Sequence, residues 1–126
     1  MNVNRRKRGF TLVEMSVVVA IIGVLYSTVV PMYGKTILRA RETALKSSLH
    51  TFRITLNNYY KDHEKWPENL EVLVREGYIR SIPPDPFTER ADTWVVVPSE
   101  IGAGDVYDIK SGADGIGLDG VKYGDF

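Results

Sequence analysis

A single carboxylate, Glu14, stands inside an apolar segment that runs from Phe10 to Tyr33. Placing a carboxylate in a bilayer costs about 2.5–3.5 kcal/mol, so an intramembrane glutamate normally has a partner and a function. Gly9 separates the apolar segment from a cluster of four basic residues, Arg5 to Arg8. Phe10, the first residue of the apolar segment, precedes Glu14 by four positions, and this spacing places the two residues on one face of a helix.

A second group of acidic side chains lies in the C-terminal segment from Tyr107 to Phe126. This segment carries four aspartates among five glycines: Asp108, Asp114, Asp119 and Asp125. Glycine lets carbonyl oxygens turn inward, and carboxylates with carbonyls suit a hard cation such as calcium. The spacing does not follow an EF-hand loop. An acidic, turn-rich tail without a metal ion is the alternative that composition alone allows.

The composition limits the kinds of protein that this chain can be. Its 126 residues leave room for one compact domain, and the absence of cysteine excludes disulfides and thiolate metal sites. Without the first nine residues the chain has 12 basic and 16 acidic side chains, which argues against non-specific nucleic-acid binding. His50 and His63 lack metal-ligand spacing and are predicted to be solvated. No nucleophile–base pair or phosphate-binding loop appears, so an enzyme is not expected.

The apolar segment is long enough to span a membrane. As a helix, the 22 residues from Phe10 to Pro31 cover about 33 Å, against about 30 Å for a bilayer core. The basic cluster before it should remain cytoplasmic, which places the rest of the chain outside the cytoplasm. Pro31 removes a backbone hydrogen bond and should bend or loosen the helix. An uncleaved signal anchor is the simpler alternative.

Beyond Gly34 the pattern becomes amphipathic and predicts that the helix continues to about Asp62. Tyr60 is predicted to lie at the rim of the core. One helical stripe is expected to pack on the head: Leu38, Leu45, Leu49, Phe52, Leu56 and Tyr59. Charged residues are expected on the other faces: Arg39, Arg41, Glu42, Lys46 and Arg53.

The remaining residues predict a small head of mixed structure. Trp66-Pro67 should end the long helix, and a short helix is expected over Glu68–Glu76. A proline-rich loop over Tyr78–Phe87 leads to strands at Thr93–Val97 and Val106–Ile109, which pair through a turn at Gly102–Gly104. The predicted fold class is therefore α+β, with a long N-terminal helix packed on a short helix and a small antiparallel sheet.

Two stretches of this pattern resemble one family. RGFTLVE, residues 8–14, resembles the junction of type IV prepilins and of the pseudopilins of type II secretion. WPENLEVLVREGYIRSIPPDPF, residues 66–87, is similar to the major pseudopilin. The resemblance implies a leader at 1–9, a transmembrane and assembly helix at 10–33 and a soluble head at 34–126. It also implies that a prepilin peptidase cuts between Gly9 and Phe10 and methylates Phe10.

The same resemblance gives roles to other residues. It implies that Glu14 meets the Phe10 amine of a neighbouring subunit, although a pair within one helix fits the spacing equally. Pro31 matches a proline at which the helix loosens on assembly. Ser111 to Gly115 resembles a calcium loop in which Asp114 is a ligand. The family has a close aspartate pair further on, where this chain has only Asp119, after a shorter gap, with Asp125 as a substitute.

The function implied is that of a structural subunit of a type II secretion pseudopilus, polymerising through its N-terminal helix to help drive protein export. Its partners would be further copies of itself, the prepilin peptidase, the inner-membrane assembly platform, minor pseudopilins and the membrane. The chain would cross the inner membrane once, with its head in the periplasm. A type IV pilus subunit for adhesion, motility or DNA uptake is the main alternative, and a membrane-anchored enzyme is a distant one.

Overall fold

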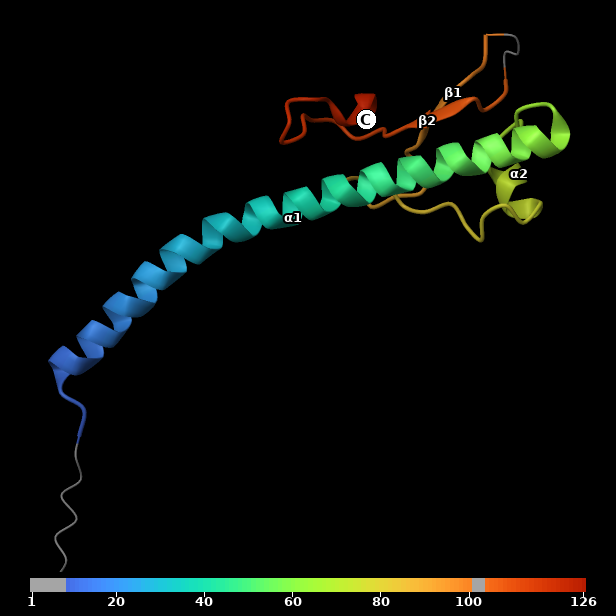
Figure 1. Ribbon diagram of the computed structural model, residues 1–126. Coiled ribbons are helices and arrows are strands. Elements are labelled where there is room, and N and C mark those ends of the chain that lie inside the picture. Colours follow the sequence, from blue (N-terminus) through green and yellow to red (C-terminus); the bar gives the residue numbers. More distant parts are fainter. Residues whose placement is uncertain (1–8, 101–103) are drawn as a thin grey trace, which may run out of the picture. The chain divides into compact units, whose positions relative to one another are not determined.

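The computed structural model describes residues 9–100 and 104–126, and Figure 1 shows its elements. In chain order these are α1 (Leu12–His63), α2 (Leu70–Arg75), β1 (Val95–Val97), β2 (Asp108–Lys110) and the 3₁₀ turn η1 (Tyr123–Asp125). The α+β class predicted from the sequence is confirmed. The chain divides into two compact units, with the boundary between Ile37 and Leu38. The leader predicted at 1–9 lies outside the described residues except for Gly9.

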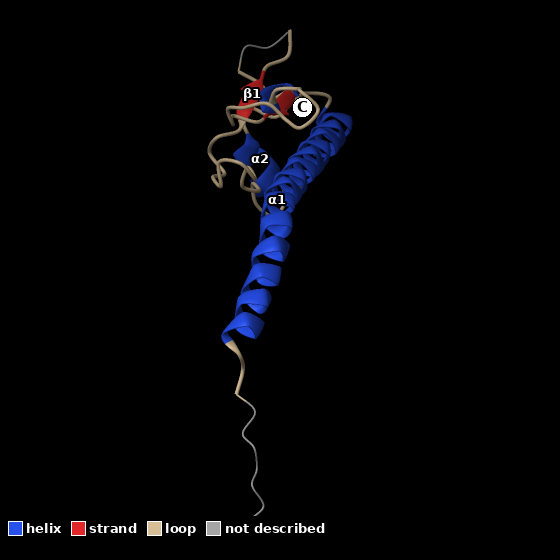
Figure 2. Ribbon diagram, turned by 90° about the vertical axis from the view of Figure 1, so that its left-hand side faces the viewer, coloured by secondary structure: helices blue, strands red, loops and turns tan. Residues whose placement is uncertain are grey.

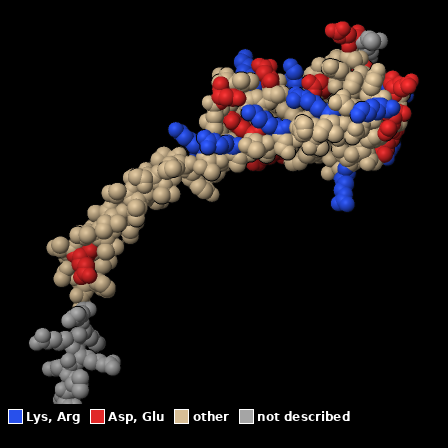
Figure 3. All heavy atoms as spheres, viewed as in Figure 1, with Lys and Arg blue, Asp and Glu red and all other residues tan. Residues whose placement is uncertain are grey.

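In the first unit, the N-terminal part of α1 is apolar and uncovered. Every residue from Gly9 to Ile37 is exposed. An 18-residue window of α1 has a mean hydropathy of 2.1, so the helix is long and apolar enough to cross a membrane. In Figure 3 this part of the molecule is almost entirely free of blue and red atoms. The helix assignment continues through Pro31 without a break, so loosening there stays a prediction.

In the second unit, α1 contributes the core stripe that the sequence predicted. Leu45, Leu49, Phe52 and Leu56 are each at most 1% exposed, and Tyr59 is 4% exposed. Leu38 is half-buried, and Tyr60 is 44% exposed, at the rim as predicted. The core is completed by side chains from the rest of the head: Leu70, Val72, Leu73, Trp94, Val106, Ile109 and Tyr123. Burial of this stripe stabilises the second half of α1, because helix propensity alone is weak.

The short helix α2 is capped more tightly than the sequence predicted. Asn69 precedes it, and its Oδ1 accepts the N–H of Val72 at 3.0 Å. At the other end Gly77 has a φ of 81°, and the N–H groups of Tyr78 and Ile79 both donate to the carbonyl of Leu73. These caps shorten the predicted helix of residues 68–76 to Leu70–Arg75.

The sheet consists of two antiparallel strands in the described residues, with Val95 opposite Lys110 and Val97 opposite Asp108. The first strand is shorter than the predicted Thr93–Val97, and the second begins later than predicted because the backbone N–H of Val106 bonds elsewhere. The Trp94 indole donates to the carbonyl of Pro83 at 2.7 Å, and the Val106 N–H donates to the carbonyl of Pro67 at 2.8 Å. Figure 2 shows that loops make up most of the head outside α1. The turn predicted at 102–104 lies outside the described residues except for Gly104.

Glu42 of α1 is placed differently from the prediction, and His63 makes contacts that the sequence did not predict. Glu42, expected on a solvent-facing side, is only 7% exposed, because it lies one helical turn before Leu45 on the core stripe. His63, expected to be solvated, is exposed but engaged. Its ring stacks on Tyr59 with centroids 4.1 Å apart, and its Nε2 lies 3.1 Å from the carboxylate of Glu76.

Candidate processing and assembly segment

The predicted cleavage junction lies just before the start of α1. Gly9 and Phe10 are both exposed, and the phenylalanine retains 78% of its accessible surface. A Cβ added to Gly9 would meet no atom within 4 Å, and the residue does not have the positive φ that favours glycine. The described fold therefore gives no reason for glycine at this position. A requirement imposed by another molecule would explain it, and the exposed junction is accessible to one.

Glu14 occupies the N3 position at the start of α1. The side-chain hydroxyl of Thr11, the residue before the helix, accepts the N–H of Glu14 at 3.2 Å. Thr11 and Glu14 therefore have the spacing of a capping box, and a carboxylate in the first turn also interacts favourably with the helix dipole. The sequence reasoning missed this local role, although the pattern Thr-x-x-Glu would have revealed it. Glu14 thus has two possible uses, one within the helix and one between subunits.

Glu42 differs from Glu14 because the head satisfies it internally. Its Oε1 accepts the N–H of Leu118, 76 residues later, at 2.7 Å. Burial, together with the nearby Glu42 carboxylate, raises the pKa of Tyr123 above its ordinary value. An added Cβ on Gly117 would lie 3.1 Å from Glu42 Oε1, so glycine permits this close approach of the C-terminal loop to α1. Glu42 therefore anchors that loop.

Lys46 lies one turn beyond Glu42 and holds the same loop. Its Nζ is 3.7 Å from Asp119 Oδ2 and 4.8 Å from the centroid of the Phe126 ring. The other carboxylate oxygen of Asp119 accepts the N–H of Val121 at 3.2 Å. Both partners of the ion pair are about half exposed, so its net contribution to stability is small. The position of the loop depends on Glu42 more than on Lys46.

The serine predicted near the calcium loop has a different partner. Ser111 is 4% exposed, and its hydroxyl donates to Oδ2 of Asp85, which is fully buried. The other oxygen of Asp85 accepts the N–H of Phe87 at 2.8 Å. Asp85 therefore links the proline-rich loop to the C-terminal segment, a contact that the sequence reasoning did not anticipate. Its place within Pro-Pro-Asp-Pro was the one available signal.

The predicted calcium ligands do not come together as a site in this arrangement. Calcium takes about six to eight oxygen ligands. In residues 9–100 and 104–126, no three acidic, histidine or cysteine side chains are grouped closely enough to hold a metal ion. Asp114 and Asp125 are exposed, and Asp119 is engaged by Lys46. No buried side-chain oxygen in these residues lacks a hydrogen-bond partner. The residues as placed do not fit the ion, so the calcium binding that the sequence and the resemblance predict would require the loop to rearrange.

The comparisons with known proteins agree with the predicted segment. The family model for the prokaryotic N-terminal methylation motif matches residues 4–27. The chain is 34% identical to the type II secretion system core protein G of Escherichia coli, with 91% of this chain and 88% of that protein covered. It is 31% identical to the protein of the same name from Pseudomonas aeruginosa, with 88% and 87% covered.

Matches to other kinds of protein are shorter. Competence protein ComGC of Halalkalibacterium halodurans is 35% identical over 56% of this chain and 70% of its own length. No solved structure matches significantly. The long relatives match this chain over about nine-tenths of its length, and the chain therefore belongs to the family of the type II secretion system core protein G.

Proposed function

We propose that this chain is a structural subunit of the type II secretion pseudopilus and polymerises through the N-terminal part of α1 to help drive protein export. The observation that carries the proposal is the uncovered apolar helix of the first unit, in which Glu14 is the only charged residue between Phe10 and Tyr33. Such a surface is stable only in a lipid bilayer or against other helices of the same kind. The identity to core protein G over most of the chain supports the same assignment.

Processing creates the group that Glu14 needs in order to be paired. Cleavage between Gly9 and Phe10 exposes an amine, and N-methylation leaves that amine cationic. In a filament, the amine of one copy would meet the Glu14 carboxylate of the next. A pair of opposite charges in a dry environment is worth much more than the same pair in water. The ion pair would thereby fix the register of neighbouring helices, with Pro31 providing the local loosening that packing needs.

The proposed location and partners follow from the apolar part of α1 and the basic cluster before it. The chain would cross the inner membrane once, because α1 offers a single span among the described residues. The head would lie in the periplasm, since the basic cluster at Arg5–Arg8 favours the cytoplasmic side. The partners would be the prepilin peptidase, the assembly platform and minor pseudopilins. We propose no catalytic role for the chain.

A type IV pilus subunit is the second candidate. Its support is the match to the type IV major pilin protein PilE1 of Neisseria gonorrhoeae, which is 35% identical over 52% of this chain. The relatives named for type II secretion cover about nine-tenths of the chain, so they describe the head as well as the helix. We therefore favour the secretion filament.

Mass spectrometry of chains sheared from the cell surface after overexpression tests the main proposal. We expect filaments built from chains that begin at N-methylated Phe10, and an accumulation of uncut chains when the peptidase gene is deleted. The variant Gly9→Val should accumulate uncut chains in the same way. It tests the junction itself, because the described fold accepts a side chain at this position. Filaments built from chains that still begin at Met1 would contradict the proposal. Deletion of the chain should also stop export of the type II substrates of its host.

A further inference from the structure

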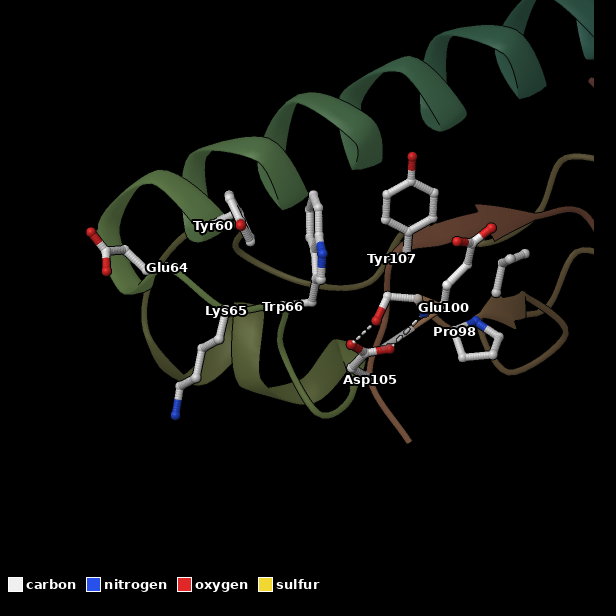
Figure 4. A pocket seen from close by; sticks show the side chains of 10 residues that line it. Tyr60, Glu64, Lys65, Trp66, Pro98, Glu100, Asp105 and Tyr107 are labelled. Carbon is white, nitrogen blue, oxygen red and sulfur yellow. Dashed lines mark hydrogen bonds between the residues drawn. The ribbon is translucent and has the colours of Figure 1, made fainter. Parts of the chain in front are cut away.

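The head contains a groove that the proposed function does not use. Residues around the end of α1 and the loop before β2 form an open cavity of about 800 Å³ (Figure 4). Three aromatic rings lie in it. Tyr60 stacks on Trp66 with centroids 4.5 Å apart, and Trp66 meets Tyr107 edge to face at 5.1 Å. Tyr60 and Tyr107, which both contact Trp66, are 44% and 52% exposed, so the groove presents aromatic surface to solvent.

A carboxylate lies beside these rings in a fixed position. Asp105 accepts the N–H of Ser99 at 2.7 Å and also the Ser99 hydroxyl, as Figure 4 shows. Those two hydrogen bonds lower the pKa of Asp105, so the carboxylate is ionised at neutral pH. The amine of Lys65 points away from the rings in Figure 4. Aromatic faces next to a held carboxylate suit a guanidinium group, which stacks on rings and pairs with carboxylates.

The net negative charge of the head comes from the two segments that frame this groove. Residues 38–126 have eleven basic and fifteen acidic side chains. Segments 61–68 and 98–108, which frame the groove, contain two basic and six acidic side chains, so they account for the whole excess. The groove would therefore attract a basic partner.

The same chain carries a basic surface of the required kind. Residues 35–41 contain Lys35, Arg39 and Arg41 and no acidic residue. Arg41 lies 3.7 Å from Glu89 within its own head. Arg39 is exposed. It precedes Tyr60 by 21 residues of one helix, a rise of about 31 Å.

We propose that the groove formed by Tyr60, Trp66, Tyr107 and Asp105 binds the side chain of Arg39 from a second copy of this chain. The inference rests on the proposed filament. Two copies displaced along α1 by about the rise between Arg39 and Tyr60 would bring the two surfaces to the same level. The contact joins two different surfaces of the chain, and such a head-to-tail contact continues from copy to copy and builds a filament. It would act between heads, separately from the pair made by Glu14.

Cysteine cross-linking in filaments of the full chain tests this contact, since the chain has no cysteine of its own. Thr43→Cys lies one turn beyond Arg39, and Lys65→Cys adjoins Trp66. Both positions are exposed, and neither belongs to the proposed contact. With a short bismaleimide we expect a ladder of covalent multimers from the double variant. The matched control pairs Thr43→Cys with Arg80→Cys, an exposed residue that does not line the groove, and should give monomers.

Charge reversal then tests whether Arg39 is the residue that the groove binds. Adding Arg39→Glu should lower the cross-linking yield on the order of tenfold, Arg39→Lys should lower it less, and Arg39→Glu with Asp105→Arg should recover part of it. Filaments that give no ladder, or a yield unaffected by Arg39→Glu, would overturn this contact and leave the proposed function intact. Absence of filaments from the unsubstituted chain would overturn the proposed function together with the contact. Cross-linking to a different protein instead of to itself would also reject the second copy as the occupant.

Discussion

The two glutamates of α1 have opposite surroundings. Glu14 lies in a stretch in which every residue is exposed, whereas Glu42 is 7% exposed and accepts the Leu118 N–H at 2.7 Å. The head alone therefore completes the environment of Glu42. The described residues of the chain leave Glu14 exposed, and the proposed function places its carboxylate against another subunit in the membrane. Under the proposed function, two residues of one type on one helix therefore serve assembly in one unit and folding in the other.

The helix segments around these glutamates differ in the same way. The first unit offers apolar side chains on all sides, including Val19, Val24 and Tyr26, each more than 60% exposed. The second unit buries one stripe and leaves polar side chains outside. Substitutions in the first unit should therefore affect assembly, and those in the second should affect the stability of the head. The predictions below test that division.

Replacing Glu14 should have the largest effect, because it removes assembly rather than weakening it. We expect Glu14→Leu to insert into the membrane at least as well as the natural chain and to yield almost no sheared filaments. Immunoblotting of membrane and sheared fractions measures both. Glu14→Gln is the informative control, because glutamine keeps the capping box but loses the charge. Filament loss in both variants points to the ion pair, whereas rescue by glutamine would assign Glu14 to helix capping.

Phe52→Ala should cause the largest loss of stability within the head. Phe52 is 1% exposed and meets Trp94 edge to face at 5.1 Å. Truncating a buried phenylalanine costs about 3–5 kcal/mol, a large part of the stability of a small domain. A chain beginning at Lys35 should be soluble and mostly monomeric, and urea denaturation of it measures the loss. Ile54→Ala, at a 46% exposed position, is the control. Equal losses from both would contradict the assigned core.

Glu42→Ala should have a smaller effect on the same measurement. It leaves the Leu118 N–H without its acceptor, and an unsatisfied polar group costs about 1–3 kcal/mol. Hydrogen exchange should also speed up across residues 117–123 in this variant. Glu71→Ala, on the exposed side of α2, should change stability by about 0.5 kcal/mol or less. An unchanged exchange rate in the loop would show that Glu42 does not anchor it.

The hydroxyl of Tyr78 should contribute a still smaller, pH-dependent stabilisation. It donates to Asp62 at 2.6 Å, and this bond, with smaller contributions from burial, raises the pKa of Tyr78 to about 12. The folded pKa lies above the ordinary value of 10.0, so the stabilisation is present below pH 10 and disappears as the pH approaches 12. The stability difference between the natural head and Tyr78→Phe should follow that course. In an Asp62→Asn background the dependence should vanish.

The sequence predicted those parts of the fold that depend on local patterns. The stripe from Leu45 to Tyr59 repeats at helical spacing, and it is buried as expected. The apolar run after Gly9 was recognisable from hydropathy and from the basic cluster before it. Both features depend on residues that are close together in the sequence, so a single sequence is enough to predict them.

The parts that the sequence did not predict depend on contacts between distant residues. Asp85 and Ser111 bond across 26 positions, and Glu42 and Leu118 across 76. A glutamate next to a leucine stripe is normally assigned to the solvent side, and only its partner reveals that it is buried. The start of the second strand shifted for the same reason, since the carbonyl of Pro67 accepts the backbone N–H of Val106, which the sequence assigned to that strand.

The smallest effect that we expect is that of removing calcium. Sequence and resemblance predict that calcium at Asp114 and Asp119 stabilises the tail, by about 2.7 kcal/mol at a hundredfold excess over Kd. The structure holds the same loop with the Glu42 bond and the Lys46–Asp119 pair at 3.7 Å. We therefore expect the melting temperature of the head to be the same in calcium and in chelator. Asp114→Ala, at an exposed residue, should not alter that result, whereas Lys46→Ala should lower the melting temperature slightly in both. A rise with calcium that Asp114→Ala abolishes would establish the metal site, and it would mean that the loop rearranges around the ion.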